Sequence, residues 1–253
     1  MLAKQWLNKV RGILDKIEST QMDSIQQAAE VMANSIGKGR WVHTFGCGHA
    51  TIPVEEMYPR IGGFVGFHPM VELPLTFFTR ITGEMGIHQF LFLERAEGYG
   101  REIMKGYNFD RRDCMWIFSH SGINNVNIDV ALRAQEIGMK VIATGSAAGF
   151  LDVQSRHSSG KKLFDLADVV IDSCVPGTDA AVPVPHHYDK LGPLSTMGFV
   201  AVVWTTILTV AELLVERGVQ LHIHPSHNIP GDTTAHDRLD DALAEYKRRV
   251  AVL

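Results

Sequence analysis

Two serines and a glycine follow the most apolar stretch in the middle of the chain. Segment 114–118 has the pattern of a buried strand, and Ser-His-Ser-Gly at 119–122 comes directly after it. Segment 126–137 then repeats apolar residues at helical spacing, so the polar residues occupy a turn before a helix. Such a turn offers backbone N–H groups and hydroxyls to an anion. The pattern favours a phosphate site, although a serine-capped structural turn fits the same spacing.

A second glycine-rich turn follows an earlier predicted strand. Strand 41–45 leads into Gly-Cys-Gly-His-Ala-Thr at 46–51, and a helix is expected from about Pro53. The turn lacks the full dinucleotide fingerprint because Thr51 stands where the third glycine belongs. Two such turns from neighbouring parallel strands meet at one edge of a sheet, so we expect them to converge on one phosphate. His49 is either a loop histidine or a substrate contact.

Paired carboxylates provide candidates for acid and base chemistry. Glu94 and Glu97 lie three residues apart in segment 93–103, the predicted start of a helix that ends before Asn108, which would place them on one face. Two carboxyls can act as base and acid when burial moves their pKa values apart. A solvated helix face is the alternative interpretation.

Histidines near the carboxyl end raise the question of a metal. His222 and His224 would lie on one side of an extended strand, as half of a zinc site, with His227 close by. Asp232 or His236 could complete it. No cysteine or second histidine pair strengthens the motif, so we expect no cofactor, with zinc at this tail as the alternative.

Several elements must position these residues. Apolar residues recur at helical spacing from Trp6 to Ile36, which predicts one long helix packed outside the sheet. Further strands are predicted at 63–67, 140–144 and 168–172, separated by helical segments, as in a parallel α/β sheet. We expect a single domain, with a helical extension at 1–39, a core at 40–218 and a tail at 219–253.

Composition narrows the function classes. The chain has 253 residues, 45% of them hydrophobic, and a formal net charge of −4, which gives no indication of nucleic-acid binding. Three scattered cysteines argue against a disulfide framework, and with no visible signal peptide we expect a cytoplasmic protein. The apolar run 197–210 is interpreted as a core or subunit-interface helix, because it is short for a membrane span.

In this order the motifs resemble the sugar isomerase (SIS) domain family of phosphosugar-binding proteins, in a stand-alone branch. The resemblance extends from about Trp41 to Asp232. Its carrying pieces are Phe-Gly-Cys-Gly-His at 45–49, Glu-Glu at 55–56, Leu-Glu-Arg-Ala-Glu-Gly-Tyr at 93–99, Ser-His-Ser-Gly at 119–122, Ser-Arg-His-Ser-Ser-Gly-Lys-Lys-Leu at 155–163 and Gly-Pro-Leu-Ser-Thr at 192–196.

The resemblance implies a three-layer sandwich around a five-stranded parallel sheet, assembled as a homodimer or homotetramer. It also implies a bound sugar phosphate. Two departures matter: Ile123 stands where the branch often has arginine, and Ala50 where a serine is usual, so Thr51 would substitute. The residues expected to hold the phosphate are Gly48, His49, Thr51, Ser119, Ser121, Gly122 and Asn124.

The implied chemistry is aldose–ketose isomerisation, or removal of an amine or ether group from an amino-sugar phosphate. Candidate bases are Glu72, Glu94 and Glu97, while His49 and His187 could supply the acid or open the ring. The alternative is a non-catalytic module that senses a sugar phosphate and acts on a protein partner. No helix-turn-helix or basic patch suggests DNA contact.

Overall fold

A parallel five-stranded sheet forms the centre of the molecule. The computed structural model describes residues 1–57, 59–76, 86–226 and 228–251. The strands are arranged in the order β2-β1-β3-β4-β5, and each pair is parallel. The α/β fold class is confirmed, with β2 beginning where the predicted strand at 63–67 ends. The strand bounds are β1 Val42–Gly46, β2 Phe67–Met70, β3 Cys114–Phe118, β4 Lys140–Gly145 and β5 Val169–Asp172.

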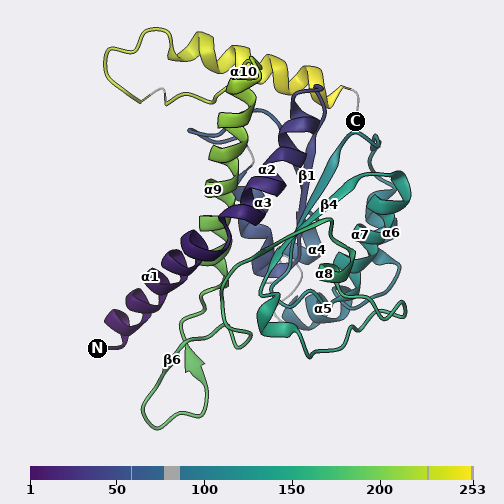
Figure 1. Ribbon diagram of the computed structural model, residues 1–253, viewed down its shortest axis with the longest axis vertical. Coiled ribbons are helices and arrows are strands. Elements are labelled where there is room, and N and C mark those ends of the chain that lie inside the picture. Colours follow the sequence, from purple (N-terminus) through teal and green to yellow (C-terminus); the bar gives the residue numbers. More distant parts are fainter. Residues whose placement is uncertain (58, 77–85, 227, 252–253) are drawn as a thin grey trace.

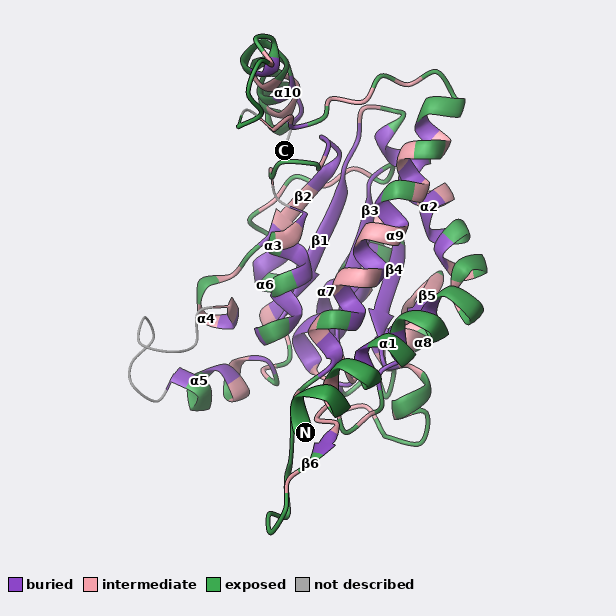
Figure 2. Ribbon diagram, turned by 90° about the vertical axis from the view of Figure 1, so that its left-hand side faces the viewer, coloured by how far each residue is buried: buried purple, intermediate pink, exposed green. Residues whose placement is uncertain are grey.

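The central strands are buried on both faces, as parallel sheets require. Successive side chains of β3 alternate between two apolar clusters: Trp116 belongs to one, and Met115 and Ile117 belong to the other. Figure 2 shows β1 and β3 as buried along their length, and β4 is buried from Val141 onward. This double burial explains why these strands form short, nearly uninterrupted apolar runs in the sequence.

Helices α1, α2, α3 and α9 cover one face (Figure 1). The predicted single amino-terminal helix is in fact two helices, separated at Gln21. The side chain of Gln21 accepts a hydrogen bond from the N–H of Asp172 (2.9 Å), which fixes the junction at the end of β5. The bounds are α1 Leu2–Thr20, α2 Met22–Ile36, α3 Ile52–Glu56 and α9 Ser195–Glu216, with the short 3-10 turn η1 at Gly48–Thr51 before α3.

Helices α5 to α8 contribute to the cluster on the opposite face. They follow β2, β3 and β4 in the chain, so the connections are the crossover units expected of a parallel sheet. The predicted irregular segment 72–92 contains two helices, and its residues 77–85 lie outside the described part. The bounds are α4 Leu73–Thr76, α5 Gly86–Leu93, α6 Tyr99–Met104, α7 Asn125–Ile137 and α8 Leu163–Leu166.

The carboxyl-terminal part folds back on the start of the sheet. Helix α10, Ala235–Val250, packs its Tyr246 edge-on against Trp41, with ring centroids 5.4 Å apart. Before α9, a small hairpin of β6 (Val182–Pro183) and β7 (Lys190–Leu191) projects from the body, at the bottom of Figure 1. The division of the chain at residues 39 and 218 stays a prediction.

The length argument made for the apolar run 197–210 is wrong. Helix α9 has 22 residues and is long and apolar enough to cross a membrane by length and composition. The helix is longer than the apolar run because it continues past residue 210 and includes the polar residues Glu212 and Glu216. Its apolar side packs on α2 and contributes Phe199, Val202 and Val203 to the core, which accounts for much of its composition.

Candidate active site

Two turns lie side by side at the carboxyl ends of β1 and β3, which pair directly. Each contains a glycine with positive φ, +62° at Gly48 and +68° at Gly122. A Cβ at Gly48 would come within 2.7 Å of the Phe90 ring, and one at Gly122 within 2.6 Å of the Phe164 ring. Both positions therefore require glycine for conformation and for space. The aromatic rings of α5 and α8 hold the turns in place from outside.

The amino terminus of α7 has no side-chain cap. Asn124 occupies the N-cap position but makes no capping hydrogen bond. Its amide instead donates to Glu94 Oε2 (2.8 Å), and its carbonyl oxygen accepts from Arg156. The first-turn N–H groups of a helix need an acceptor from outside the helix. The N–H of Val126 donates to the backbone carbonyl of Glu94 (3.3 Å), but no side chain caps the helix. The other first-turn N–H groups can therefore donate to an anion.

The predicted hydroxyls have different surroundings. Ser119 is 5% exposed, and its Oγ accepts a hydrogen bond from the N–H of Gly122 (3.1 Å), which shapes the turn. Ser121 is half-buried, and its hydroxyl has no partner among the described residues. Thr51 is buried and donates to the carbonyl of Gly48, so it holds the first turn together. His49 is exposed on the outside of that turn.

Glu94 is buried between the two turns. Only 8% of the residue is exposed, and burial raises the pKa of its carboxyl, opposed by Arg95, Arg156 and the hydrogen bond from Asn124. Burial raises the pKa of the Cys47 thiol, and the charge of Glu94 adds to that effect, which places the carboxyl near the first turn as well. A carboxyl with a raised pKa next to an anion site is a candidate general base.

Glu72 approaches the same region from the end of β2. It is half-buried, and burial raises the pKa of its carboxyl. Burial raises the pKa of the Tyr99 and Tyr107 phenols, and the charge of Glu72 raises both further. Cys47 adds to the effect on Tyr99. The structure therefore brings two of the three predicted carboxyls toward the first turn, although they are 22 residues apart in the sequence.

Glu97 does not share a helix face with Glu94, and that prediction is wrong. Helix α5 ends at Leu93 and α6 begins at Tyr99, because Gly98 adopts φ +90° between them. Glu97 is exposed and accepts hydrogen bonds from the N–H and hydroxyl of Ser158, which lower the pKa of its carboxyl. Its role in the structure is to anchor a loop.

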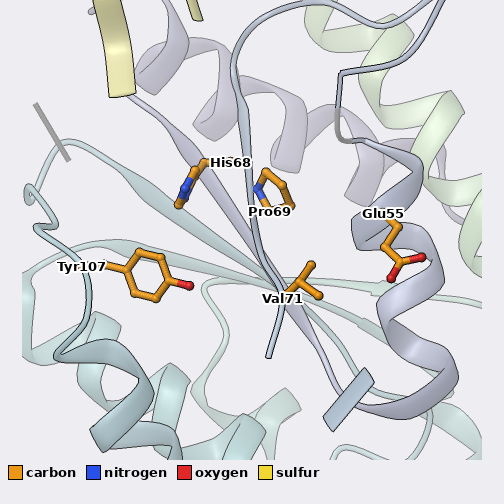
Figure 3. A pocket seen from close by; sticks show the side chains of 5 residues that line it. All are labelled: Glu55, His68, Pro69, Val71 and Tyr107. Atoms are coloured by element: carbon orange, nitrogen blue, oxygen red, sulfur yellow. The ribbon is translucent and has the colours of Figure 1, made fainter. Parts of the chain in front are cut away.

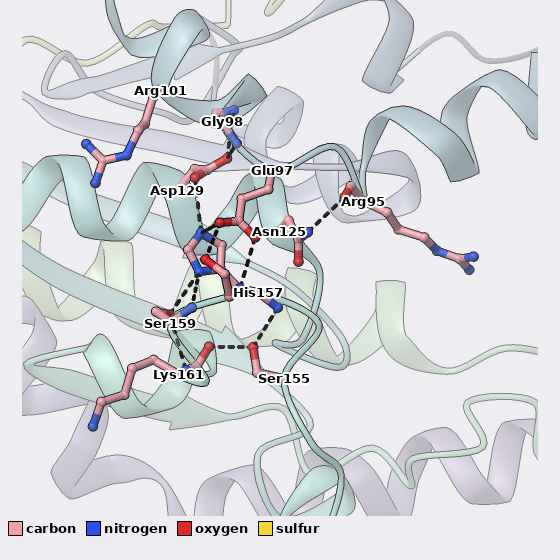
Figure 4. A network of polar contacts seen from close by, with 12 residues as sticks. Arg95, Glu97, Gly98, Arg101, Asn125, Asp129, Ser155, His157, Ser159 and Lys161 are labelled. Atoms are coloured by element: carbon pink, nitrogen blue, oxygen red, sulfur yellow. Dashed lines mark hydrogen bonds and ion pairs between the residues drawn. The ribbon is translucent and has the colours of Figure 1, made fainter.

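That loop, residues 155–161, is held by a network around Asp129 (Figure 4). Buried Asp129 accepts from the N–H of Gly98 (2.7 Å) and contacts His157 Nε2 (3.2 Å). His157 Nδ1 in turn lies 2.9 Å from the hydroxyl of Ser159. The network joins the start of α6, the middle of α7 and the loop into one unit.

Arg156 is the site residue that the sequence reasoning did not assign. Its N–H donates to the carbonyl of Ile123 (3.1 Å), and its guanidinium donates to Asn124. A positive charge therefore lies beside the turn at 119–124, although residue 123 is not an arginine. The motif at 155–163 was noticed, but nothing local in it indicates a contact with a turn 32 residues away.

Comparison with known proteins establishes the family. The SIS domain family model matches residues 5–146, more than half of the chain. The chain belongs to the SIS domain family. A UPF0309 protein of Oceanobacillus iheyensis is 34% identical over 98% of this chain and 97% of its own length. A UPF0309 protein of Thermoanaerobacter pseudethanolicus is 32% identical over 97% of this chain and 98% of its own.

Solved structures share the SIS fold at low sequence identity. A phosphoheptose isomerase from Francisella tularensis has a TM-score of 0.52 at 14% identity, covering 83% of this chain and 96% of that one. The phosphoheptose isomerase GmhA of Neisseria gonorrhoeae has a TM-score of 0.51 at 13% identity, with 83% and 97% covered. These likenesses establish the architecture of this SIS domain.

Other predicted residues lie away from the buried carboxyls of the SIS core. His187 is exposed in the turn between β6 and β7, in the hairpin that projects from the body in Figures 1 and 2. Nothing in the described part of the chain brings it against Glu72 or Glu94. A role for His187 within one SIS domain gains no support from this position.

The tail histidines are separated from one another by their contacts. His222 Nδ1 lies 2.8 Å from Asp241 Oδ2, whereas His224 is buried and burial lowers the pKa of its imidazole. Asp232 is paired with Arg238. His227 lies outside the described residues. Within residues 1–57, 59–76, 86–226 and 228–251, no three histidine, cysteine or acidic side chains are grouped to hold a metal ion.

Proposed function

We propose that this SIS domain binds a sugar phosphate at the turn 119–124 and catalyses aldose–ketose isomerisation or a related amino-sugar phosphate reaction. The observation that carries the proposal is that no side chain caps the amino terminus of α7. Asn124 turns its side chain away from the helix, and Ser121 presents a hydroxyl without a partner among the described residues. A phosphate oxygen would accept from exactly these kinds of donor.

Arg156 supplies the positive charge of the proposed site. A phosphate held only by neutral donors would rely on the helix dipole, whose effect is modest at an exposed position. The guanidinium is already placed at Asn124 by the 155–161 loop. A substrate phosphate could replace Asn124 as the acceptor of that guanidinium and gain a charge-assisted hydrogen bond.

Glu94 is the proposed base and Glu72 the proposed acid. For an open-chain aldose, the Glu94 carboxylate would take the proton from C2 while protonated Glu72 gives its proton to the carbonyl oxygen at C1, which forms an enediol. Return of the proton to C1 and loss of the O2 proton would give the ketose. Burial raises the pKa of both carboxyls toward the range in which such transfers are efficient. His49, beside the turn, is a candidate for opening the ring.

The test is thermal unfolding with a panel of hexose, pentose, N-acetylhexosamine and N-acetylmuramic acid phosphates. A ligand at about a hundred times its dissociation constant adds about 2.7 kcal/mol, which raises Tm by roughly 5–10 °C. The phosphate-free sugars serve as controls. No shift with any phosphosugar would contradict the proposal. A shift without turnover of any panel member would leave a sensing module that acts on a protein partner.

Substitution of Arg156 separates its role from general charge effects. We expect Arg156→Gln to weaken binding of the shifting phosphosugar by roughly tenfold, the loss of one charge-assisted hydrogen bond. Arg95→Gln is the matched control, because Arg95 is also exposed and close to Glu94 but is not bonded to Asn124. Equal losses in both variants would remove Arg156 from the phosphate site. Isothermal titration calorimetry measures the difference.

A further inference from the structure

A cavity of about 440 Å³ lies beside the edge strand β2 (Figure 3). Its size suits a small organic molecule. It is formed by α3, by β2 and its end, and by the segment between α6 and β3, so its described walls share no residue with the turns at 46–51 and 119–124. The lining residues are Glu55, His68, Pro69, Val71 and Tyr107.

A line of polar contacts runs from this cavity into the core. His68 Nδ1 lies 3.0 Å from Nδ1 of His43, which is fully buried on the neighbouring strand. On its other side, His43 Nε2 lies 3.4 Å from Asp113 Oδ2. Asp113 receives two hydrogen bonds from Arg40, each 2.8 Å, and others from the N–H groups of Trp41 (3.0 Å) and Asp110 (2.8 Å).

These contacts determine where the imidazole protons reside. Burial alone would raise the pKa of Asp113, but the nearby His43 and the hydrogen bonds from Arg40 and the backbone hold it below its usual range, so Asp113 is an ionised acceptor. The contact to His43 Nε2 is long, yet a lone pair there would face the carboxylate and be repelled. His43 therefore carries its proton on Nε2 and accepts at Nδ1 from the Nδ1–H of His68.

His68 consequently offers an unprotonated Nε2 on the side that His43 does not occupy. Burial, followed by the proximity of His43, lowers the pKa of His68 to about 4, so the ring is neutral at physiological pH. A neutral imidazole with a fixed tautomer is a good acceptor for an N–H donor. The line Arg40–Asp113–His43 thus fixes the hydrogen-bonding character of the cavity wall.

The charged carboxylate among the described lining residues is Glu55, which is exposed at the rim of the cavity. The described lining residues include no lysine or arginine. The ring of Tyr107 adds an aromatic wall, which also favours a cation. This is the opposite of the anion-binding character at the start of α7.

We propose that this cavity binds a small organic ammonium ion. Its N–H group donates to His68 Nε2, Glu55 at the opposite rim attracts its charge, and its apolar part packs on Pro69, Val71 and Tyr107. The site is separate from the proposed phosphate site and does not depend on it.

The test compares cyclohexylammonium with cyclohexanol, which are similar in shape but differ in charge. Each is titrated into the protein labelled with ¹⁵N-histidine, and the ring nitrogens of His68 are followed by NMR. We expect cyclohexylammonium to shift the His68 Nε2 resonance saturably and to bind about fivefold tighter or more than cyclohexanol, the combined effect of an exposed ion pair and a cation–π contact. Before titration, Nε2 is expected to show the chemical shift of an unprotonated nitrogen.

Two substitutions locate the effect. Glu55→Gln should remove most of the preference for the ammonium ion, because Glu55 is exposed and its loss leaves the fold intact. Glu18→Gln removes an exposed carboxylate from a different groove and should leave the preference unchanged. Equal binding of both probes, no binding of either, an unchanged preference in Glu55→Gln, or a protonated Nε2 in the free protein would each overturn the proposal.

Discussion

Two buried carboxyl groups at opposite ends of the sheet have pKa values that are shifted in opposite directions. Asp113 precedes β3 at the amino end and receives hydrogen bonds from Arg40 and from two backbone N–H groups. Glu94 lies at the carboxyl end, and its carboxyl receives a hydrogen bond from the side chain of Asn124. Hydrogen bonds hold the pKa of Asp113 below its usual range against its burial, whereas burial raises that of Glu94.

The difference separates a structural carboxylate, Asp113, from the proposed functional one, Glu94. A buried charge whose acceptor sites are filled by its own fold stabilises the arrangement that fills them. A buried carboxyl with few donors costs free energy, and such a cost is typical of sites that carry chemistry. On this comparison the carboxyl proposed to react lies among the turns after β1 and β3, and the structural one lies at the start of the sheet.

Glu94→Gln should have the largest effect on activity. We expect turnover of the active phosphosugar to fall roughly 10²–10⁴-fold, the usual contribution of a positioned base. The free energy of unfolding should stay the same or rise, because a neutral amide can still accept from Asn124 without the cost of a buried charge. Steady-state kinetics and urea unfolding measure the two effects. A large loss of stability would show that Glu94 resembles Asp113.

Asp113→Asn should act in the opposite way. Removing one partner of a buried ion pair typically costs about 3–5 kcal/mol, because Arg40 is left without its carboxylate. Phosphosugar binding by the folded variant should be unchanged. The double variant Arg40→Met with Asp113→Asn should recover part of the lost free energy of unfolding, because no unpaired guanidinium remains and the asparagine oxygen can still accept from a backbone N–H. An activity loss without a stability loss would contradict the assignment.

Ser121→Ala tests the anion site with a smaller change. We expect phosphosugar binding to weaken by about 1.5–3 kcal/mol, since one hydrogen bond to a charged oxygen is lost. Unfolding of the free protein should hardly change, because the hydroxyl has no partner among the described residues. Ser159→Ala, in the 155–161 loop, is the control that should alter stability more than affinity. The reverse result would move the phosphate elsewhere.

The histidines beside Asp113 predict a dependence of stability on pH. Burial lowers the pKa of His68 to about 4 from its usual 6.5, and it also lowers that of His43. The unfolded chain therefore binds more protons in this window, so their contribution is complete above pH 6.5 and is lost as pH falls toward 4. His68→Gln should lose less stability than the wild type between pH 7 and 5 in urea unfolding. The same change in the free energy of unfolding with pH in His68→Gln and in the wild type would contradict this prediction.

Local patterns predicted the strands and the turn that leads into α7. The apolar run 114–118 and the helical spacing after it depend on neighbours in the chain, and β3 and α7 form where they indicate. The roles of Ser121 and Glu94 stay predictions, but the structure brings their segments together. Gly98, with φ +90°, divides the helix that was predicted across Glu94 and Glu97.

Contacts between distant segments could not be predicted. Arg156 reaches Asn124 across 32 residues, and His43 meets His68 across 25. In each pair the strand register or a loop network determines the contact, while the local sequence around each residue is ordinary. The position of His187 on a projecting hairpin is likewise a matter of tertiary packing.

The most direct test of the phosphate site is a titration of the ¹⁵N-labelled protein with inorganic phosphate, followed by NMR of the backbone amides. The account predicts saturable shifts of the amides at 121–125, weaker in Ser121→Ala, with little change around Asp113. Absence of shifts at 121–125, or the same shifts and affinity in Ser121→Ala, would contradict an anion site at the start of α7.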